Sequence, residues 1–204
     1  MSSVPTKKRT YRMSARAEAA ARTRERLLSA AWQHFATLPY EDVRLHDIAT
    51  EASVTVQTLH TSFGSKDQLL TAAFLWWGEQ AITRRDTAPV GDVAAAIRIL
   101  YDTYEAHGSA ILRMLTQEDR IAEIRQMTDA GRAYHRDWTA RTFQPLLAGQ
   151  RGRPRERRLT AIVVATDLLV WKLLRREMGL DRREAEHTVA AMIHSPSVTG
   201  HRLG

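Results

Sequence analysis

The chain contains two short helical patterns joined by a break of only three residues. In the first, apolar side chains recur at i, i+3, i+4 and i+7, which marks one face of a helix: Leu45, Ile48, Ala49 and Ala52. The pattern breaks at residues 53–55 and resumes with Leu59 and Phe63, which are four residues apart and therefore share a helix face. Helices this short are not stable alone, so tertiary packing must hold them. Two short helices joined by a tight turn predict a helix-turn-helix, whose second helix enters the DNA major groove.

The second of these helices has two chemically different faces. We expect its apolar side chains, Val54, Leu59 and Phe63, to be buried. Their expected packing partners are Leu28, Phe35, Ile48 and Ala49. The opposite face presents small or polar side chains that reach base edges and phosphates: Thr55, Gln57, Thr58, His60 and Thr61. The sequence thus predicts a helix held by its apolar face, with its polar face at the surface.

The flanking patterns are helical too. The preceding helix is predicted to begin near Ser14 and to end at Pro39, after about 13 residues that show no periodicity and are expected to be disordered. Its apolar stripe consists of Leu28, Ala31, Trp32 and Phe35. The next helix begins at Ser65, which is placed to form a capping box with Gln68.

Longer helices follow residue 91. They are predicted over residues 92–106, 109–117, 121–149 and 159–178, and from Asp181 onward. Gly108 is expected to separate the first two, Gly179 to end the fourth, and Glu184 to complete a capping box with Asp181. No stretch alternates with a period of two for long enough to predict a strand. The sequence therefore predicts an all-α protein.

Composition excludes several classes of protein. The 204 residues include no cysteine, so disulfides and thiolate metal sites are excluded, and a reducing compartment is favoured. The longest nearly apolar run, residues 159–174, is shorter than a membrane span and contains Asp167 and Lys172. No secretory signal is recognisable, and we expect a cytoplasmic protein. The chain also lacks an HExxH pair, a GxSxG elbow and a phosphate-binding glycine loop, so we expect no enzyme, no metal and no cofactor.

The net charge of +7 is concentrated in two segments. Residues 1–26 hold eight Lys or Arg against two Glu, a net of +6, and residues 151–158 hold five Arg against one Glu, a net of +4. Such clusters favour a polyanionic partner. The alternative is a solvated tail and a solvated loop.

Residues 21–75 resemble the DNA-binding domain of the TetR family of bacterial transcriptional regulators. The shared stretch is "LLSAAWQHFATLPYEDVRLHDIATEASVTVQTLHTSFGSKDQLLTAAF". Within it, the "AA…F" of the first helix, "DIA", "A-x-V-T", "T-L-x-x-x-F" and "SK-x-x-L" keep the family spacing. Three positions depart from the pattern: Ser53 replaces the usual turn Gly, His60 the common Tyr and Arg44 a frequent Thr. A left-handed Ser53 would cost about 1 kcal/mol or more.

The resemblance implies which residues bind DNA. The expected contacts are Arg44, Thr55, Val56, Gln57, Thr58, His60, Thr61 and Lys66. Lys66 and Arg44 are expected at phosphates, and Gln57 and Thr61 at base edges, because Gln pairs with adenine and a Thr methyl contacts thymine. The alternative for His60 is local hydrogen bonding, and the alternative for Thr58 is that its side chain faces its own helix. The basic arm, with Lys7, Lys8, Arg9 and Arg12, is expected along the DNA backbone or in a neighbouring minor groove.

The helix over residues 159–174 is apolar on nearly all sides and needs cover on all of them. One subunit covers only part of it, so we expect a homodimer, which also suits a palindromic operator. The expected interface residues are Leu159, Val163, Val170, Leu174, Ala185, Val189, Met192 and Ile193. The resulting boundaries are 1–20 for a basic, partly disordered arm, 21–81 for the DNA-binding domain, 82–195 for a ligand-binding and dimerisation domain, and 196–204 for a flexible tail.

The resemblance also suggests a small-molecule effector. The candidate ligand-binding residues are Trp77, Tyr101, Tyr104, Met114, Trp138, Phe143, Asp167 and Trp171, with Asp102 and Glu105 as further polar groups. The alternative is that these aromatic side chains form core. We therefore expect a ligand-released repressor, and the competing hypothesis is a regulator that responds to no ligand or to a protein partner.

Overall fold

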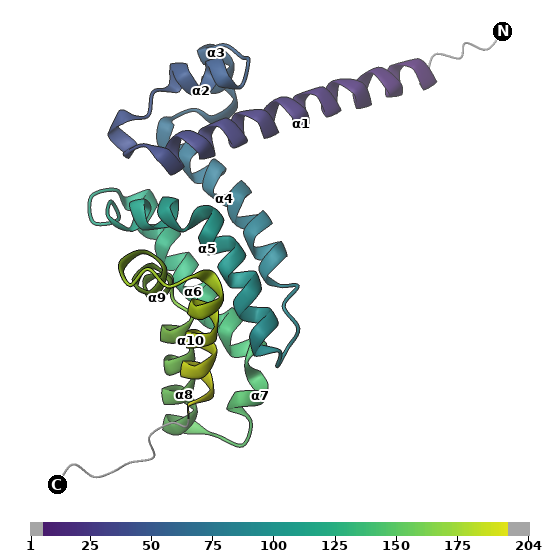
Figure 1. Ribbon diagram of the computed structural model, residues 1–204. Coiled ribbons are helices and arrows are strands. Elements are labelled where there is room, and N and C mark those ends of the chain that lie inside the picture. Colours follow the sequence, from purple (N-terminus) through teal and green to yellow (C-terminus); the bar gives the residue numbers. More distant parts are fainter. Residues whose placement is uncertain (1–5, 196–204) are drawn as a thin grey trace. The chain divides into compact units, whose positions relative to one another are not determined.

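The computed structural model describes the backbone of residues 6–195 and the side chains from residue 15 to residue 195 (Figure 1). Every element assigned within that range is helical, which confirms the predicted all-α class. The chain divides into two compact units, Met1–Gly78 and Glu79–Gly204. None of the described helices combines the length and hydropathy that a membrane span requires.

The N-terminal unit contains three helices, a short 3-10 turn and the start of a fourth helix. These elements are α1 (Thr6–Thr37), η1 (Tyr40–Asp42), α2 (Leu45–Glu51), α3 (Val56–Phe63) and α4 (Lys66–Arg85). The predicted stripe on α1 is buried together with the apolar side chains of α2 and α3. Helix α1 begins at Thr6, so the prediction of a start near Ser14 after an irregular arm was wrong. The expected tail over residues 196–204 lies outside the described residues.

The turn between α2 and α3 contains a strained residue. Ser53 has φ 55°, and it is the one positive-φ residue other than glycine that the described backbone shows. The left-handed region is unfavourable for any residue with a Cβ atom. The turn therefore has the left-handed conformation for which the TetR family usually has glycine, although Ser53 occupies the position.

The C-terminal unit contains longer helices around one apolar core. Its elements are α5 (Val93–Leu115), α6 (Ala122–Thr142), α7 (Gln144–Leu147), α8 (Gly152–Ala165), α9 (Leu168–Lys172), the π-helical turn η2 (Leu173–Glu177) and α10 (Arg182–His194). Side chains from α5 to α10 share the core. The predicted capping box of Asp181 and Glu184 is present at the start of α10.

Helix α5 continues through Gly108, where the sequence predicted a break. A Cβ atom at Gly108 would lie 2.6 Å from the ring of Trp171, so the position has no room for one. Glycine weakens a helix by about 0.5–1 kcal/mol relative to alanine. Here the close approach of the Trp171 ring requires glycine, and the packing overrides the local helix-breaking signal.

The prediction of a single helix over residues 159–178 was also wrong, because the helix is interrupted at Thr166. Helix α8 ends at Ala165, and Asp167 starts α9 by accepting the N–H of Leu169 at 2.8 Å. Helix α8 begins at Gly152, so most of the arginine-rich run, for which a solvated loop was the alternative interpretation, is helical. Arg158 from this run is buried and donates to the carbonyl groups of Ile193 and Ser195, the latter at 2.7 Å. It therefore stabilises the C-terminal end of α10, where a positive charge is favourable.

Candidate nucleic-acid interface

Side-chain caps fix the beginning of α3 and of α4. The hydroxyl oxygen of Thr55 accepts the backbone N–H of Thr58 at 3.1 Å, as an N-cap residue does. Gln68 and Ser65 exchange the two bonds of the predicted capping box, each at 3.1 Å. Residues adjacent in the sequence therefore cap the N-termini of both helices, α3 before the tight bend at Gly64 and α4 after it.

The two faces of α3 differ as predicted. Leu59 and Phe63 are buried, and Val54 is half-buried. Gln57, Thr58, His60 and Thr61 are exposed, together with the cap residue Thr55. Helix α3 therefore holds to its unit by apolar contacts and offers a polar surface.

The outward side chains of α3 differ in the groups that they leave free. Gln57 makes no side-chain hydrogen bond within residues 15–195, so its amide is available to bond a base edge. The Thr61 hydroxyl donates to the Gln57 carbonyl at 2.9 Å, and His60 Nδ1 lies 3.0 Å from the Gly64 carbonyl. The hydroxyl groups of Thr58 and Thr55 are 2.9 Å apart. Gln57 is accordingly the freest donor and acceptor on this face.

Lys66 and Arg44 flank α3 in different ways. The Lys66 ammonium lies 4.3 Å from the ring centroid of Tyr40, a cation–π contact. Burial lowers the pKa of Lys66, and the carboxylates of Glu41, Asp67 and Asp42 oppose that shift. Arg44 is the exposed residue before α2, with an extended backbone. Both cations lie beside the helix-turn-helix, and Lys66 rests on an aromatic support.

Three residues of this surface were not predicted from the sequence. The Arg24 guanidinium lies 4.7 Å from the ring centroid of Phe63, and Arg26 Nε donates to the Ala52 carbonyl at 3.3 Å. Tyr40, which supports Lys66, stacks on Phe35 with the ring centroids 6.1 Å apart. In the sequence, both arginines belong to the basic segment over residues 1–26. No local pattern distinguishes an arginine that packs on the helix-turn-helix from one that is free.

The four arm cations lie on the first turns of α1. Lys7, Lys8, Arg9 and Arg12 fall within the helical range, while their side chains lie outside the described part of the chain. Their proposed contacts with DNA stay a prediction.

The arrangement of α2 and α3 is also found in known proteins. A short helix that exposes a polar face after a tight turn defines a helix-turn-helix protein. Residues 27–73 match the family described as bacterial regulatory proteins, tetR family, which confirms the resemblance seen over residues 21–75. None of the curated proteins is similar enough to count as a match. The chain thus carries the DNA-binding domain of the TetR family.

Solved structures extend the likeness in fold beyond residues 27–73. A transcriptional regulator from Rhodococcus sp. Rha1 has a TM-score of 0.65 at 17% identity, over 83% of this chain and 92% of its own. A tetR-family regulator from Streptomyces coelicolor has a TM-score of 0.66 at 16% identity, over 83% and 79%. A transcriptional regulator from Saccharomonospora viridis, solved in complex with choline, has a TM-score of 0.63 at 22% identity, over 86% and 96%. These structures show that the fold is shared with TetR-family transcriptional regulators.

The structure places most candidate ligand-binding residues in the core of the C-terminal unit. Tyr101, Tyr104, Met114, Trp138, Phe143 and Trp171 are buried there. Asp167 caps α9 instead of standing free. Trp77 belongs to the N-terminal unit, where its ring stacks on Trp32 with the centroids 4.3 Å apart. Ligand binding by these residues stays a prediction.

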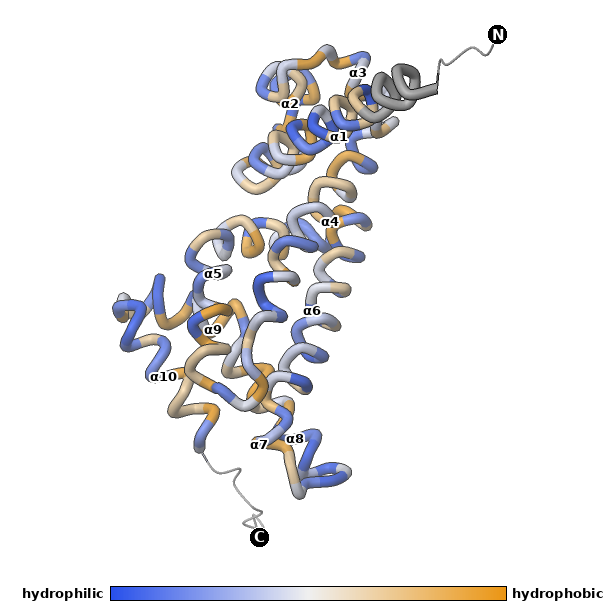
Figure 2. The backbone as a smooth tube through the Cα atoms, turned by 90° about the vertical axis from the view of Figure 1, so that its right-hand side faces the viewer, coloured by the Kyte–Doolittle hydropathy of each residue, from blue (hydrophilic) through white to orange (hydrophobic). Residues whose placement is uncertain are grey.

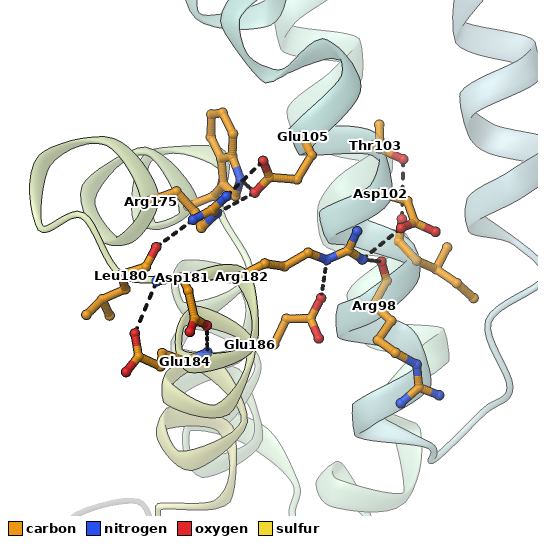
Figure 3. A network of polar contacts seen from close by, with 12 residues as sticks. Arg98, Asp102, Thr103, Glu105, Arg175, Leu180, Asp181, Arg182, Glu184 and Glu186 are labelled. Carbon is orange, nitrogen blue, oxygen red and sulfur yellow. Dashed lines mark hydrogen bonds and ion pairs between the residues drawn. The ribbon is translucent and has the colours of Figure 1, made fainter.

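A polar network joins α10 and the turn before it to α5 (Figure 3). Asp102 accepts from Arg84 at 2.6 Å and from Arg182 at 2.7 Å, and these bonds hold its pKa below the usual value. Glu105 accepts from Arg175 at 2.6 Å and from the Trp171 indole at 3.0 Å, with its pKa lowered for the same reason. Both carboxylates that we considered for a cationic ligand are therefore already engaged by arginine.

The candidate dimer residues separate into two groups. Leu159, Leu174, Ala185, Val189 and Ile193 are buried within the chain itself, and Val163 and Val170 are half-buried. Met192 is 42% exposed. Large apolar side chains with a similar exposure in the same segments are Val164 (53%), Leu169 (58%) and Leu173 (45%). The hydrophobic colouring along α9 in Figure 2 belongs partly to this exposed set.

Proposed function

We propose that the protein is a transcriptional repressor that binds a palindromic operator as a homodimer and leaves it when a small molecule binds. The observation that carries the DNA-binding role is the exposed polar face of α3, with a free Gln57 amide on a helix held by Leu59 and Phe63. The proposed role is binding without catalysis.

In this proposal Gln57 and Thr61 contact base edges. Glutamine bonds adenine bidentately, and a threonine methyl contacts thymine. Thr55, Val56, Thr58 and His60 lie near the phosphates or the edge of the groove, and Lys66 and Arg44 bind phosphates. Each phosphate contact adds to the salt dependence of binding, because it releases counterions from the duplex.

The homodimer is supported by the apolar side chains that one chain leaves exposed. Val164, Leu169, Leu173 and Met192 extend along the last helices of the fold. Scattered exposed apolar side chains are normal, but several in neighbouring helical segments suit a subunit interface. A two-fold dimer presents two copies of α3, as a palindrome with half-sites one helical turn apart requires. Val163 and Val170 would lie at the edge of this interface.

The effector is supported by the fold and by the aromatic side chains of the C-terminal unit. The Saccharomonospora viridis regulator of the same fold was solved with choline. The competing function is a regulator without a small-molecule effector. Its support is that six of the candidate residues are already packed in the core.

Selection from random duplexes tests the DNA-binding role. We expect the wild-type protein to enrich an inverted repeat, and the double variant Gln57→Ala, Thr61→Ala to lose that selectivity while keeping its melting temperature. The matched control is Gln80→Ala, Thr83→Ala on α4, since Thr83 bonds the Glu79 carbonyl as Thr61 bonds that of Gln57. Selection unchanged by the α3 substitutions would contradict the proposal.

A further inference from the structure

The last residue of α4, Arg85, places its side chain among three aromatic rings. The guanidinium carbon lies 5.9 Å from the ring centroid of Tyr104, 5.6 Å from that of Tyr134 and 5.3 Å from that of Trp138. All three distances are within the range of a cation–π contact. Because Tyr104 belongs to α5 and the other two to α6, the three rings form a cage for a cation between two helices.

Arg85 differs from its neighbour Arg84 in the partners of its guanidinium. Arg84 is paired with the Asp102 carboxylate at 2.6 Å. Among the ion pairs of residues 15–195, none includes Arg85. The backbone carbonyl of Arg85 accepts the Trp138 indole N–H at 3.1 Å, so the main chain has its own anchor. No carboxylate within that range holds the side chain, whose contacts are those with the rings, including a hydrogen bond to Tyr104. If the side chain left the cage, the end of α4 would keep its main-chain bond to α6.

A buried polar atom beside the cage has no hydrogen-bond partner among the residues that the structure describes. The His135 ring stacks on Trp138 with the centroids 6.1 Å apart, and its Nε2 lies 3.2 Å from the Thr166 hydroxyl. Its Nδ1 has no hydrogen-bond partner, which is unusual for a buried polar atom. Burial, and then the charge of Arg85, lower the pKa of His135 to about 4. The imidazole is thus neutral at neutral pH and does not repel a cation in the cage.

We propose that the cage of Tyr104, Tyr134 and Trp138 binds a small organic cation, and that Arg85 occupies it in competition with that ligand. The inference rests on the effector-released regulator proposed above and names the chemical class of its effector. A guanidinium or a quaternary ammonium fits, since both are weakly hydrated and spread their charge over a surface that stacks on rings. A primary ammonium is strongly hydrated and fits less well.

Displacement of Arg85 by a ligand would act on the C-terminal end of α4. Helix α4 begins in the N-terminal unit at Lys66 and ends in the C-terminal unit at Arg85. A ligand that takes the place of Arg85 removes the side-chain contact at the end of this helix. A tethered side chain competes at an effective concentration in the millimolar range, so Arg85 should weaken ligand binding by about tenfold or more.

Titration calorimetry with propylguanidinium tests the competition. This ion reproduces the end of an arginine side chain, and propylurea is its uncharged isostere. We expect Arg85→Ala to bind propylguanidinium at least tenfold more tightly than the wild-type protein and to bind propylurea no better. Arg84→Ala, the control on the neighbouring arginine, should behave as the wild type. Equal affinities of Arg85→Ala and wild type, or equal affinities for the two compounds, would overturn the proposal.

Tyr134, the half-buried ring of the cage, allows a second test that preserves folding. In the Arg85→Ala background, Tyr134→Phe keeps the ring and removes the hydrogen bond to Asp86, so propylguanidinium binding should persist. Tyr134→Leu removes the ring and should weaken binding at least fivefold, with melting temperatures measured for both variants. Loss of binding in both variants, or in neither, contradicts a cage.

Operator binding is measured separately on the same proteins. If the wild type binds its operator but Arg85→Ala binds no propylguanidinium, the cation site is wrong and the DNA-binding role stands. If Arg85→Ala binds the cation while no variant recognises DNA, the proposed regulator is wrong and the cage is not. A cation that binds the cage of the wild type and leaves operator affinity unchanged would overturn its assignment as the effector.

Discussion

The helix-turn-helix and the C-terminal unit are stabilised in different ways. Around α3, residues adjacent in the sequence define the structure: Thr55 and Ser65 cap their helices, and a tight turn separates α2 from α3. In the C-terminal unit, arginines and aromatic rings join helices that are distant in the sequence, as Arg158, Arg175 and Arg182 do. Basic residues therefore have two roles in this protein. Arg44 and Lys66 remain at a surface, whereas Arg158, Arg175 and Arg182 connect helices of the C-terminal unit.

The largest effect is expected at Arg158. Arg158→Ala should lower the free energy of unfolding by about 3 kcal/mol, because it removes charge-assisted bonds to two carbonyl groups and a buried side chain. Denaturant unfolding followed by circular dichroism measures it. Arg157→Ala is the control, since Arg157 is exposed and should change stability by less than about 0.5 kcal/mol. Equal effects of the two substitutions would break the distinction between connecting and free arginines.

Substitution of two helical glycines tests how much contacts between distant residues contribute to stability. Gly108→Ala should destabilise the protein by about 2 kcal/mol, because the new methyl group meets the Trp171 ring. Gly131→Ala, on α6, has nothing within 4 Å of the new Cβ and should stabilise by about 0.5–1 kcal/mol. Thermal unfolding of both variants gives the signs. The same sign for both would show that local propensity, rather than the Trp171 contact, governs α5.

Acid should weaken the C-terminal unit through His135. Its pKa is lowered from 6.5 to about 4 by burial and then by the charge of Arg85, so the unfolded chain takes up the proton first as the pH falls. Stability is therefore lost between pH 6.5 and pH 4, by about 2 kcal/mol at pH 5. Urea unfolding at a series of pH values measures it, and His135→Leu should flatten the curve over this window. An unchanged slope in the variant would assign the loss to other groups.

The smallest effect is expected at Ser53, where the N-terminal unit departs from its own local signals. Ser53→Gly should stabilise the protein by about 1 kcal/mol, because glycine adopts φ 55° without steric cost. Ser62→Gly within α3 should instead destabilise by about 0.5 kcal/mol through helix propensity. Thermal melts compare the two, and a loss of stability in Ser53→Gly would mean that the serine side chain supports the turn.

The sequence predicted the N-terminal unit better than the C-terminal unit for a physical reason. The caps at Thr55 and Ser65, the buried Leu59 and Phe63 and the strained Ser53 follow from residues close in the chain. The spacing of the apolar residues predicted the buried and outward faces of α3, and Ser65 with Gln68 predicted the capping box. The left-handed Ser53 was expected from the resemblance to the TetR family.

Several of the errors concern contacts between distant residues. No local pattern shows that the Trp171 ring packs against Gly108 and keeps α5 continuous, or that Arg158 binds the end of α10. The cage around Arg85 was missed for the same reason, because its rings come from two helices. The break after Ala165 did have a local signal, since Asp167 is a good N-cap residue, and the apolar run around it concealed that signal.

The hydrogen bond of Thr61 to its own helix determines what that side chain offers to a duplex. With its hydroxyl hydrogen donated to the Gln57 carbonyl, Thr61 has no donor left for a base, and its methyl group is the part that suits the proposed thymine contact. Reading at that position would then depend on a nonpolar substituent of the pyrimidine, and an operator synthesised with deoxyuridine should bind more weakly although its Watson–Crick pairing is intact.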